Sequence, residues 1–140
     1  MLPICFPEAL AEMKSHRAAG RRLVLVSGGL DVVLAPLAEA LGAELLAQRL
    51  VATGDRLTGE YQSYAVLGEQ ESAVSQAARK AAALARYAET TGIDLRASVA
   101  YGDSVNDVAM LEMVGTPIVV RPDRRLARIA NERGWDVRRW

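Results

Sequence analysis

Two aspartates, Asp103 and Asp107, lie four residues apart in the stretch VAYGDSVNDVAML, directly after a short apolar run. If that run is a strand, Asp103 leaves its end and Asp107 follows about one helical turn later, so both carboxylates can face one volume. Hard oxygen ligands of this kind suit Mg²⁺, with water completing its octahedral shell. A structural interpretation stays open, in which Asp103 caps the next helix and Asp107 is a first-turn acid at the helix dipole.

A second candidate site follows the apolar run LVLV. Ser27 comes directly after this run and is followed by Gly28 and Gly29. Glycine amides at the start of a helix can bind an anion, and the serine hydroxyl adds a further donor. The alternative is a glycine-rich turn with a capping serine.

The third candidate is Lys80, one of two lysines in the chain with Lys14. It precedes the acidic pair in an alanine-rich stretch that predicts a helix. A lysine in this place can neutralise phosphoryl charge or pair with a carboxylate. A helix lysine that faces solvent is the alternative.

Short strands and helices must position these residues. The first of these strands, RRLVLV, is a β-branched and leucine run without alternation, which is typical of a parallel strand buried on both faces. Helices are predicted over 7–19, 30–42, 69–92, 108–115 and 123–134, strands over 21–26, 97–101, 117–120 and 135–137, and a hairpin or meander around Gly54-Asp55 within 43–66.

The repeated order of strand, turn and helix predicts an α/β fold with a doubly wound parallel sheet. Ligands of such sheets collect at the carboxyl ends of the strands, so we expect the loop at Ser27 and the loop at Asp103 to meet there. The 140 residues are 51% hydrophobic, as is usual for one ordinary domain.

Composition also narrows the function classes. The sequence has 17 Lys and Arg residues and 17 Asp and Glu residues. This balance argues against a nucleic-acid partner and against membrane binding through a polybasic surface. A single cysteine, Cys5, excludes an internal disulfide and suits a reducing compartment. We find no targeting segment and expect a cytoplasmic protein.

Taken in order, Ser27 after an apolar strand, Lys80 and then GDSVND resemble motifs II, III and IV of the haloacid dehalogenase (HAD) superfamily of phosphohydrolases. Residues 7–50 and 80–140 look like the subfamily IB group that includes phosphoserine phosphatase. Residues 62–79 fit loosely, because SQAAR stands where the family usually has a glycine before the motif III lysine.

The resemblance implies a role for each candidate on the phosphoryl side of the site. Ser27 would hydrogen-bond the transferring phosphoryl group, helped by the amides of Gly28 and Gly29. Lys80 would stabilise its charge. The substrate would be a small phosphorylated metabolite.

The resemblance also implies that Asp103 ligates Mg²⁺ and that Asp107 supports the metal, directly or through water. The family's nucleophile is a further aspartate, in a DxDGT or DxDxT motif at the end of the first strand, and it forms an aspartyl-phosphate. No two aspartates of these 140 residues have the Asp-x-Asp spacing; they stand at 31, 55, 94, 103, 107, 123 and 136.

In the family, that first strand lies mid-sheet, between the strands of motifs II and IV. We therefore interpret residues 1–140 as a single incomplete HAD-like core domain that is inactive alone and self-associates or needs a complementing chain. The alternative is a non-catalytic module that binds phosphate and Mg²⁺. A receiver domain fits less well, because it carries its acids on an early strand and its lysine on a late one.

Overall fold

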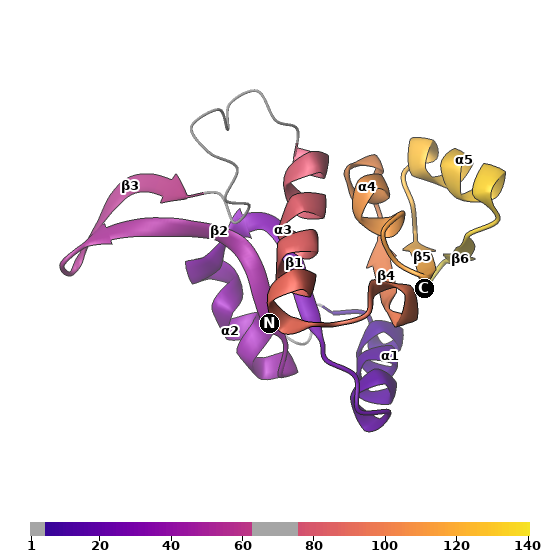
Figure 1. Ribbon diagram of the computed structural model, residues 1–140, viewed down its shortest axis with the longest axis horizontal. Helices are drawn as coiled ribbons and strands as arrows, with labels where there is room; N and C mark the ends of the chain where they lie inside the picture. Colours follow the sequence, from indigo (N-terminus) through magenta and orange to yellow (C-terminus); the bar gives the residue numbers. More distant parts are fainter. Residues whose placement is uncertain (1–4, 63–75) are drawn as a thin grey trace. The chain divides into compact units, whose positions relative to one another are not determined.

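The computed structural model of the chain describes residues 5–62 and 76–140 (Figure 1). The chain divides into two compact units, Met1–Tyr64 (unit 1) and Ala65–Trp140 (unit 2). Each unit contains a three-stranded sheet. Parallel pairing within both sheets confirms the predicted α/β class. The expectation that residues 1–140 form one domain stays a prediction.

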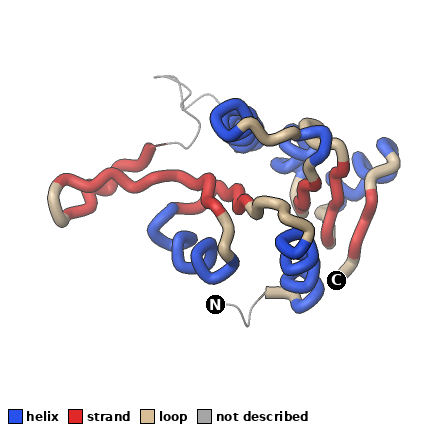
Figure 2. Tube along the Cα trace, turned by 60° about the horizontal axis from the view of Figure 1, so that its bottom comes forward, coloured by secondary structure: helices blue, strands red, loops and turns tan. Residues whose placement is uncertain are grey.

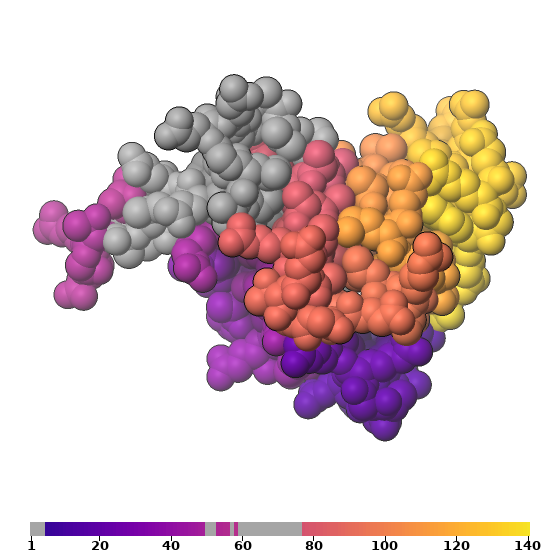
Figure 3. Space-filling model, viewed as in Figure 1, coloured from indigo at the N-terminus to yellow at the C-terminus, as the bar shows by residue number. Residues whose placement is uncertain are grey.

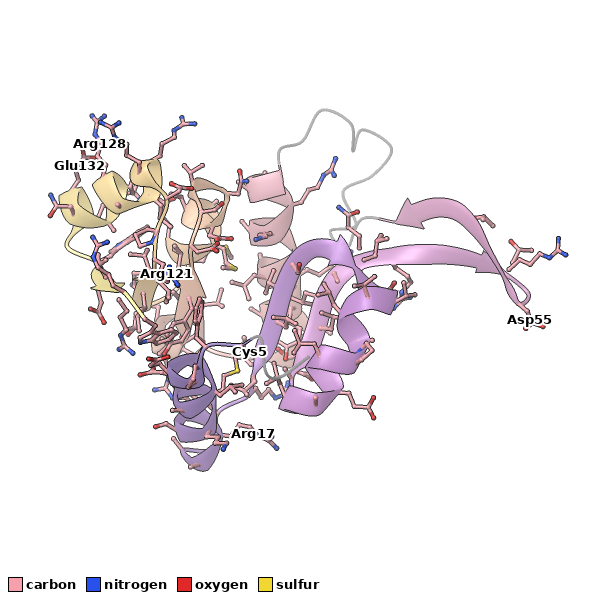
Figure 4. The ribbon with its side chains drawn as sticks, turned by 180° about the vertical axis from the view of Figure 1, so that it is seen from behind. Cys5, Arg17, Asp55, Arg121, Arg128 and Glu132 are labelled. Atoms are coloured by element: carbon pink, nitrogen blue, oxygen red, sulfur yellow. The ribbon has the colours of Figure 1, made fainter. Side chains whose placement is uncertain are left out.

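The two helices of unit 1 begin and end where the sequence predicts. Helix α1 (Pro7–Ala18) has proline in its first turn, where the missing N–H has no intrahelical partner to lose. Helix α2 (Asp31–Leu41) ends at Gly42, whose φ of 63° is left-handed and favours glycine. The guanidinium of Arg17 (Figure 4) donates to the Leu41 carbonyl at 3.2 Å, so α1 is joined to the end of α2.

The sheet of unit 1 is mixed. Strand β1 (Val24–Leu30) pairs in parallel with β2 (Glu44–Thr53), and β2 pairs antiparallel with β3 (Arg56–Gln62). The turn between β2 and β3 is Gly54-Asp55, and Gly54 has a positive φ of 62°. Figure 2 shows these two strands running side by side as an extended hairpin, and Figure 4 shows Asp55 at its tip. The predicted hairpin is confirmed.

Strand β1 differs from the prediction in two ways. It does not stop at Val26 but continues through Leu30, and its pairing with β2 is irregular over the serine-glycine stretch, since Val26 pairs with Leu46 and Leu30 with Gln48. It is also half-buried rather than buried on both faces. In the described part of unit 1, only Ala38 and Ala47 are buried, so few apolar side chains cover the strand.

Unit 2 alternates helices and strands, with short 3-10 turns (η) between some of them. Its strands are all parallel, in the order β4-β5-β6. The elements are α3 (Gln76–Thr91), η3 (Leu95–Ala97), β4 (Val99–Gly102), η4 (Val105–Asp107), α4 (Val108–Leu111), β5 (Thr116–Val120), α5 (Arg124–Arg133) and β6 (Asp136–Arg138).

The core of unit 2 lies where α4 and α5 pack on the sheet. Leu126 and Ala130 are one turn apart on α5, and both are fully buried against Leu111 and Val119. Arg128 and Glu132, on the same helix, project outward (Figure 4). In Figure 3 the atoms of α3, of the segment carrying α4 and of α5 follow one another across this unit.

The predicted helix over 108–115 is too long. Helix α4 has a single turn, and Gly115 does not end it. Instead, the Gly115 N–H donates to the Leu95 carbonyl at 3.0 Å, and a side chain at Gly115 would overlap the Arg96 carbonyl. The glycine is therefore needed for the close approach of η3. The first part of the predicted helix over 69–92 lies outside the described residues.

Within the two described ranges, we find no helix that combines the length and apolar character needed to cross a bilayer.

Candidate functional site

The loop between β4 and α4 is organised by Asp107. This side chain is buried, with 4% of its surface exposed. Its Oδ2 atom accepts the N–H groups of Asp103 at 3.1 Å and of Ser104 at 3.2 Å. Because these amides face no partner strand or helix, the carboxylate satisfies donors that the turn would otherwise leave open.

Gly102 lets Asp107 fold back onto the end of β4. A Cβ atom at Gly102 would lie 2.7 Å from the Asp107 Cβ, closer than real side-chain contacts. The backbone angle of Gly102 is not positive. A glycine is therefore needed here for the close approach of Asp107 and not for a special backbone angle.

Lys80 reaches the same carboxylate from α3. Its Nζ atom lies 2.7 Å from the Asp107 Oδ1, and only 14% of the lysine side chain and 6% of the aspartate side chain are exposed. Helix α3 packs against η4 and α4, which brings the lysine over the loop. Lys80 is therefore a largely buried partner of a carboxylate and does not face solvent.

Asp103 presents a different kind of carboxylate. The residue is exposed, and its backbone N–H and C=O bind Asp107 and Asp123. The hydroxyl of Ser104, rather than Asp103, accepts the N–H of Asn106 at the start of η4, at 3.0 Å. The capping interpretation of Asp103 is therefore wrong, and its carboxylate is the one that a ligand can reach.

Of the two aspartates, Asp103 is the one whose carboxylate could ligate Mg²⁺ at the carboxyl end of β4. Asp103 offers hard oxygens, whereas both oxygens of Asp107 already accept hydrogen bonds. Asp107 therefore suits a supporting role through water better than direct ligation. Among the described residues, no group of three or more His, Cys, Asp or Glu side chains could hold a metal ion. Water or other groups would fill the remaining positions.

Ser27 lies in β1 of unit 1. Its Oγ accepts the N–H of Gly29 at 3.1 Å. Helix α2 begins only at Asp31, so the expectation that Gly28 and Gly29 lie at the start of a helix is wrong. A side chain at Gly29 would lie 3.1 Å from Leu34, so close packing favours glycine there.

Asp123 is a residue that sequence reasoning missed. It lies directly before α5, and its Oδ1 accepts the N–H of Leu126 at 2.8 Å while its Oδ2 accepts the N–H of Val105 at 2.9 Å. These backbone hydrogen bonds, that of Leu126 first, lower the pKa of the carboxyl below its usual value. An aspartate at the start of a helix is a capping signal, but nothing in the spacing indicates its bond to the acidic loop.

A model of the haloacid dehalogenase-like hydrolase family matches residues 2–112. The chain belongs to this family. Among curated relatives, it is 40% identical over 137 residues to the "Inhibition of morphological differentiation protein" of Streptomyces azureus, covering 96% of this chain and 46% of that protein. It is 38% identical over 136 residues to "Probable phosphatase Rv3661" of Mycobacterium tuberculosis, covering 96% and 44%.

Solved structures of HAD-like enzymes have the same fold. A substrate-bound phosphoserine phosphatase superposes with a TM-score of 0.69 at 27% identity, covering 93% of this chain and 56% of that chain. The family resemblance and the fold class inferred from the motifs are thereby confirmed. The chain spans about half the length of the curated relatives that it matches.

Proposed function

We propose that this chain supplies the Mg²⁺-binding and phosphoryl-binding part of a HAD-type phosphomonoester hydrolase. The observation that carries the proposal is the buried Lys80–Asp107 pair, 2.7 Å apart, beneath a loop that exposes the Asp103 carboxylate. A cation and an acid held together at the carboxyl end of a parallel strand suit a phosphoryl group and its metal. The family membership and a relative named as a phosphatase support the same activity.

Each residue has a role that follows from its environment. Mg²⁺, when bound, would neutralise negative charge on the phosphoryl oxygens. Asp103 would be its protein ligand, because its carboxylate is exposed. Asp107 would hold the loop and orient Lys80, whose ammonium would offset phosphoryl charge. Ser27 would donate a hydrogen bond from its hydroxyl group to the phosphoryl group. Its oxygen accepts the N–H of Gly29, which leaves the O–H available as a donor.

The proposed substrate is a small phosphorylated metabolite in the cytoplasm. The likeness to a phosphoserine phosphatase structure makes phosphoserine the first compound to test. Because these residues contain no Asp-x-Asp pair, we propose that the chain alone does not turn over substrate.

The edge of β4 opposite β5 is the proposed place for a complementing strand. Strand β6, at the other edge of this sheet, contains Asp136 and Arg138, which lie 3.1 Å apart as an ion pair, and charged residues protect an edge from pairing. Strand β4 (VAYG) contains no charged residue, and among the described strands it pairs only with β5. We propose that a strand carrying the nucleophilic aspartate, from another segment or chain, pairs with this edge.

Hydrolysis of p-nitrophenyl phosphate with Mg²⁺ tests the proposal in two steps. The chain alone is expected to show negligible turnover. Co-expression with the unmatched remainder of a full-length relative is expected to give turnover that Asp103→Asn abolishes. Robust turnover by the chain alone, lost on Asp103→Asn, would overturn the proposal that the nucleophile must be supplied.

A non-catalytic module that binds Mg²⁺ and phosphate is the second candidate, favoured by the missing Asp-x-Asp pair. The same experiment separates the two functions. If the co-expressed complex forms and binds Mg²⁺ but gives no turnover, the binding module is supported and the hydrolase is not.

A further inference from the structure

The acidic loop is held from two sides. Asp107 accepts the N–H groups of Asp103 and Ser104 from within the loop. Asp123 holds it from outside: its Oδ2 accepts the Val105 N–H at 2.9 Å, and its own N–H donates to the Asp103 carbonyl at 2.9 Å. The two contacts of Asp123 flank Ser104 and fix the backbone from which the Asp103 side chain projects.

Asp123 also connects this loop to the core of unit 2. Its Oδ1 accepts the N–H of Leu126 at 2.8 Å, and the Leu126 side chain is fully buried with Leu111 and Val119. One carboxylate therefore bridges a loop amide and the first turn of a well-packed helix. Loops are otherwise among the least stable parts of a fold, so this anchor reduces the number of loop conformations.

We infer that Asp123 is a positioning residue that holds loop 103–107 in the conformation presenting the Asp103 carboxylate. That this conformation serves a metal rests on the proposed Mg²⁺ role of Asp103. Groups that orient metal ligands without touching the metal typically change metal affinity about 10–100-fold when they are replaced.

Helix capping alone would not require an aspartate. Asparagine caps helices about as well as aspartate, because one side-chain oxygen is enough to accept the N–H in the first turn. The bridge needs two accepting oxygens, one for Leu126 and one for Val105. Asp123→Asn can keep the cap but loses one acceptor, which separates capping from positioning.

The experiment compares the full chain with Asp123→Asn and with a control, Asp94→Asn. Asp94 is also an aspartate that precedes a helical turn, and its Oδ1 accepts the Arg96 N–H at 2.9 Å. Hydrogen–deuterium exchange measures the loop directly, and Mn²⁺ titration followed by electron paramagnetic resonance measures the metal site. Asp123→Asn is expected to accelerate exchange across 103–107 but not in the later turns of α5, and to weaken Mn²⁺ binding about 10-fold or more. Asp94→Asn is expected to change neither loop exchange nor Mn²⁺ binding.

The outcomes separate this inference from the proposed function. Unchanged loop exchange in Asp123→Asn overturns the inference, whatever Mn²⁺ does. Faster loop exchange with unchanged Mn²⁺ affinity also overturns it, because the loop would then not position the ligand. A third outcome is that the wild type binds no Mn²⁺ while Asp123→Asn still exchanges faster across the loop. This outcome upholds the role of Asp123 in holding the loop and refutes the metal role of Asp103.

Discussion

Replacing Lys80 by methionine tests whether the Lys80–Asp107 pair holds the acidic loop in place. Methionine keeps much of the length and apolar stem of lysine and removes the ammonium, so Asp107, with 6% of its side chain exposed, loses its counter-charge. Breaking a buried ion pair costs about 3–5 kcal/mol. Asp107 keeps two backbone N–H donors and the pair is not fully buried, so we expect a loss of about 2–4 kcal/mol in the free energy of unfolding.

The two tryptophans of the chain give a specific assay. Trp135 and Trp140 both lie in unit 2, so their fluorescence during urea unfolding, without metal, reports the unit that contains the pair. A loss of about 2–4 kcal/mol is large against a typical total of about 5–15 kcal/mol. The shift in the urea midpoint measures this loss, provided that the slope of the free energy of unfolding against urea concentration is unchanged.

A double-mutant cycle isolates the pair. Asp107→Asn alone leaves the Lys80 ammonium without its counter-charge, and we expect a comparable loss. The double variant should be more stable than the sum of the two losses predicts, by about 1–3 kcal/mol. The control is Arg128→Gln, which breaks an exposed pair with Glu132, 3.1 Å apart, and should cost about 0.2–1 kcal/mol. If Lys80→Met costs no more than this control, the reasoning is refuted.

Three further predictions concern the loop and the two units. Gly102→Ala should destabilise unit 2 by about 1–3 kcal/mol, because a Cβ would lie 2.7 Å from that of Asp107; a urea midpoint equal to wild type would contradict the close approach. The folded pKa of Asp123 is lowered, so its contribution is fully present above the unfolded value of about 3.9 and is lost as pH falls through the folded pKa. Urea midpoints measured from neutral pH downward should therefore decline less for Asp123→Asn than for wild type, and equal declines would count against the two hydrogen bonds. Finally, thermal unfolding by circular dichroism should be broad and should not coincide with that by tryptophan fluorescence, since the described part of unit 1 has few buried side chains; one sharp, coincident transition would contradict this.

Local signals in the sequence were sufficient for most helix ends. Gly42, Gly92 and Gly134 all adopt left-handed angles directly after helices, as glycine allows without strain. Gly115 could not be interpreted in the same way, because glycine is needed there to let a carbonyl group of η3 approach closely. The continuation of β1 past the serine-glycine stretch was missed too, because Leu30 pairs again with Gln48 of β2 after an irregularity, and such a long-range pairing is not contained in a local pattern.

The candidate site was predictable in its residue types but not in its contacts. The types and spacing of Asp103, Asp107 and Lys80 indicated a metal and phosphate site. The difference between the two aspartates, one exposed and one buried, depends on which amides and cations each carboxylate meets, and these contacts are tertiary properties. Asp123 was missed for the same reason: its bond to Val105 joins segments 18 residues apart.

Calorimetric titration of Mg²⁺ into the full chain and into Asp103→Asn tests directly whether the loop after β4 binds the metal through Asp103. We expect that the wild type binds Mg²⁺, that Asp103→Asn does not, and that Asp94→Asn, which removes a carboxylate charge elsewhere in unit 2, binds as the wild type does. Equal binding by wild type and Asp103→Asn, or no binding by either, would contradict the assignment of the loop after β4 as the metal site.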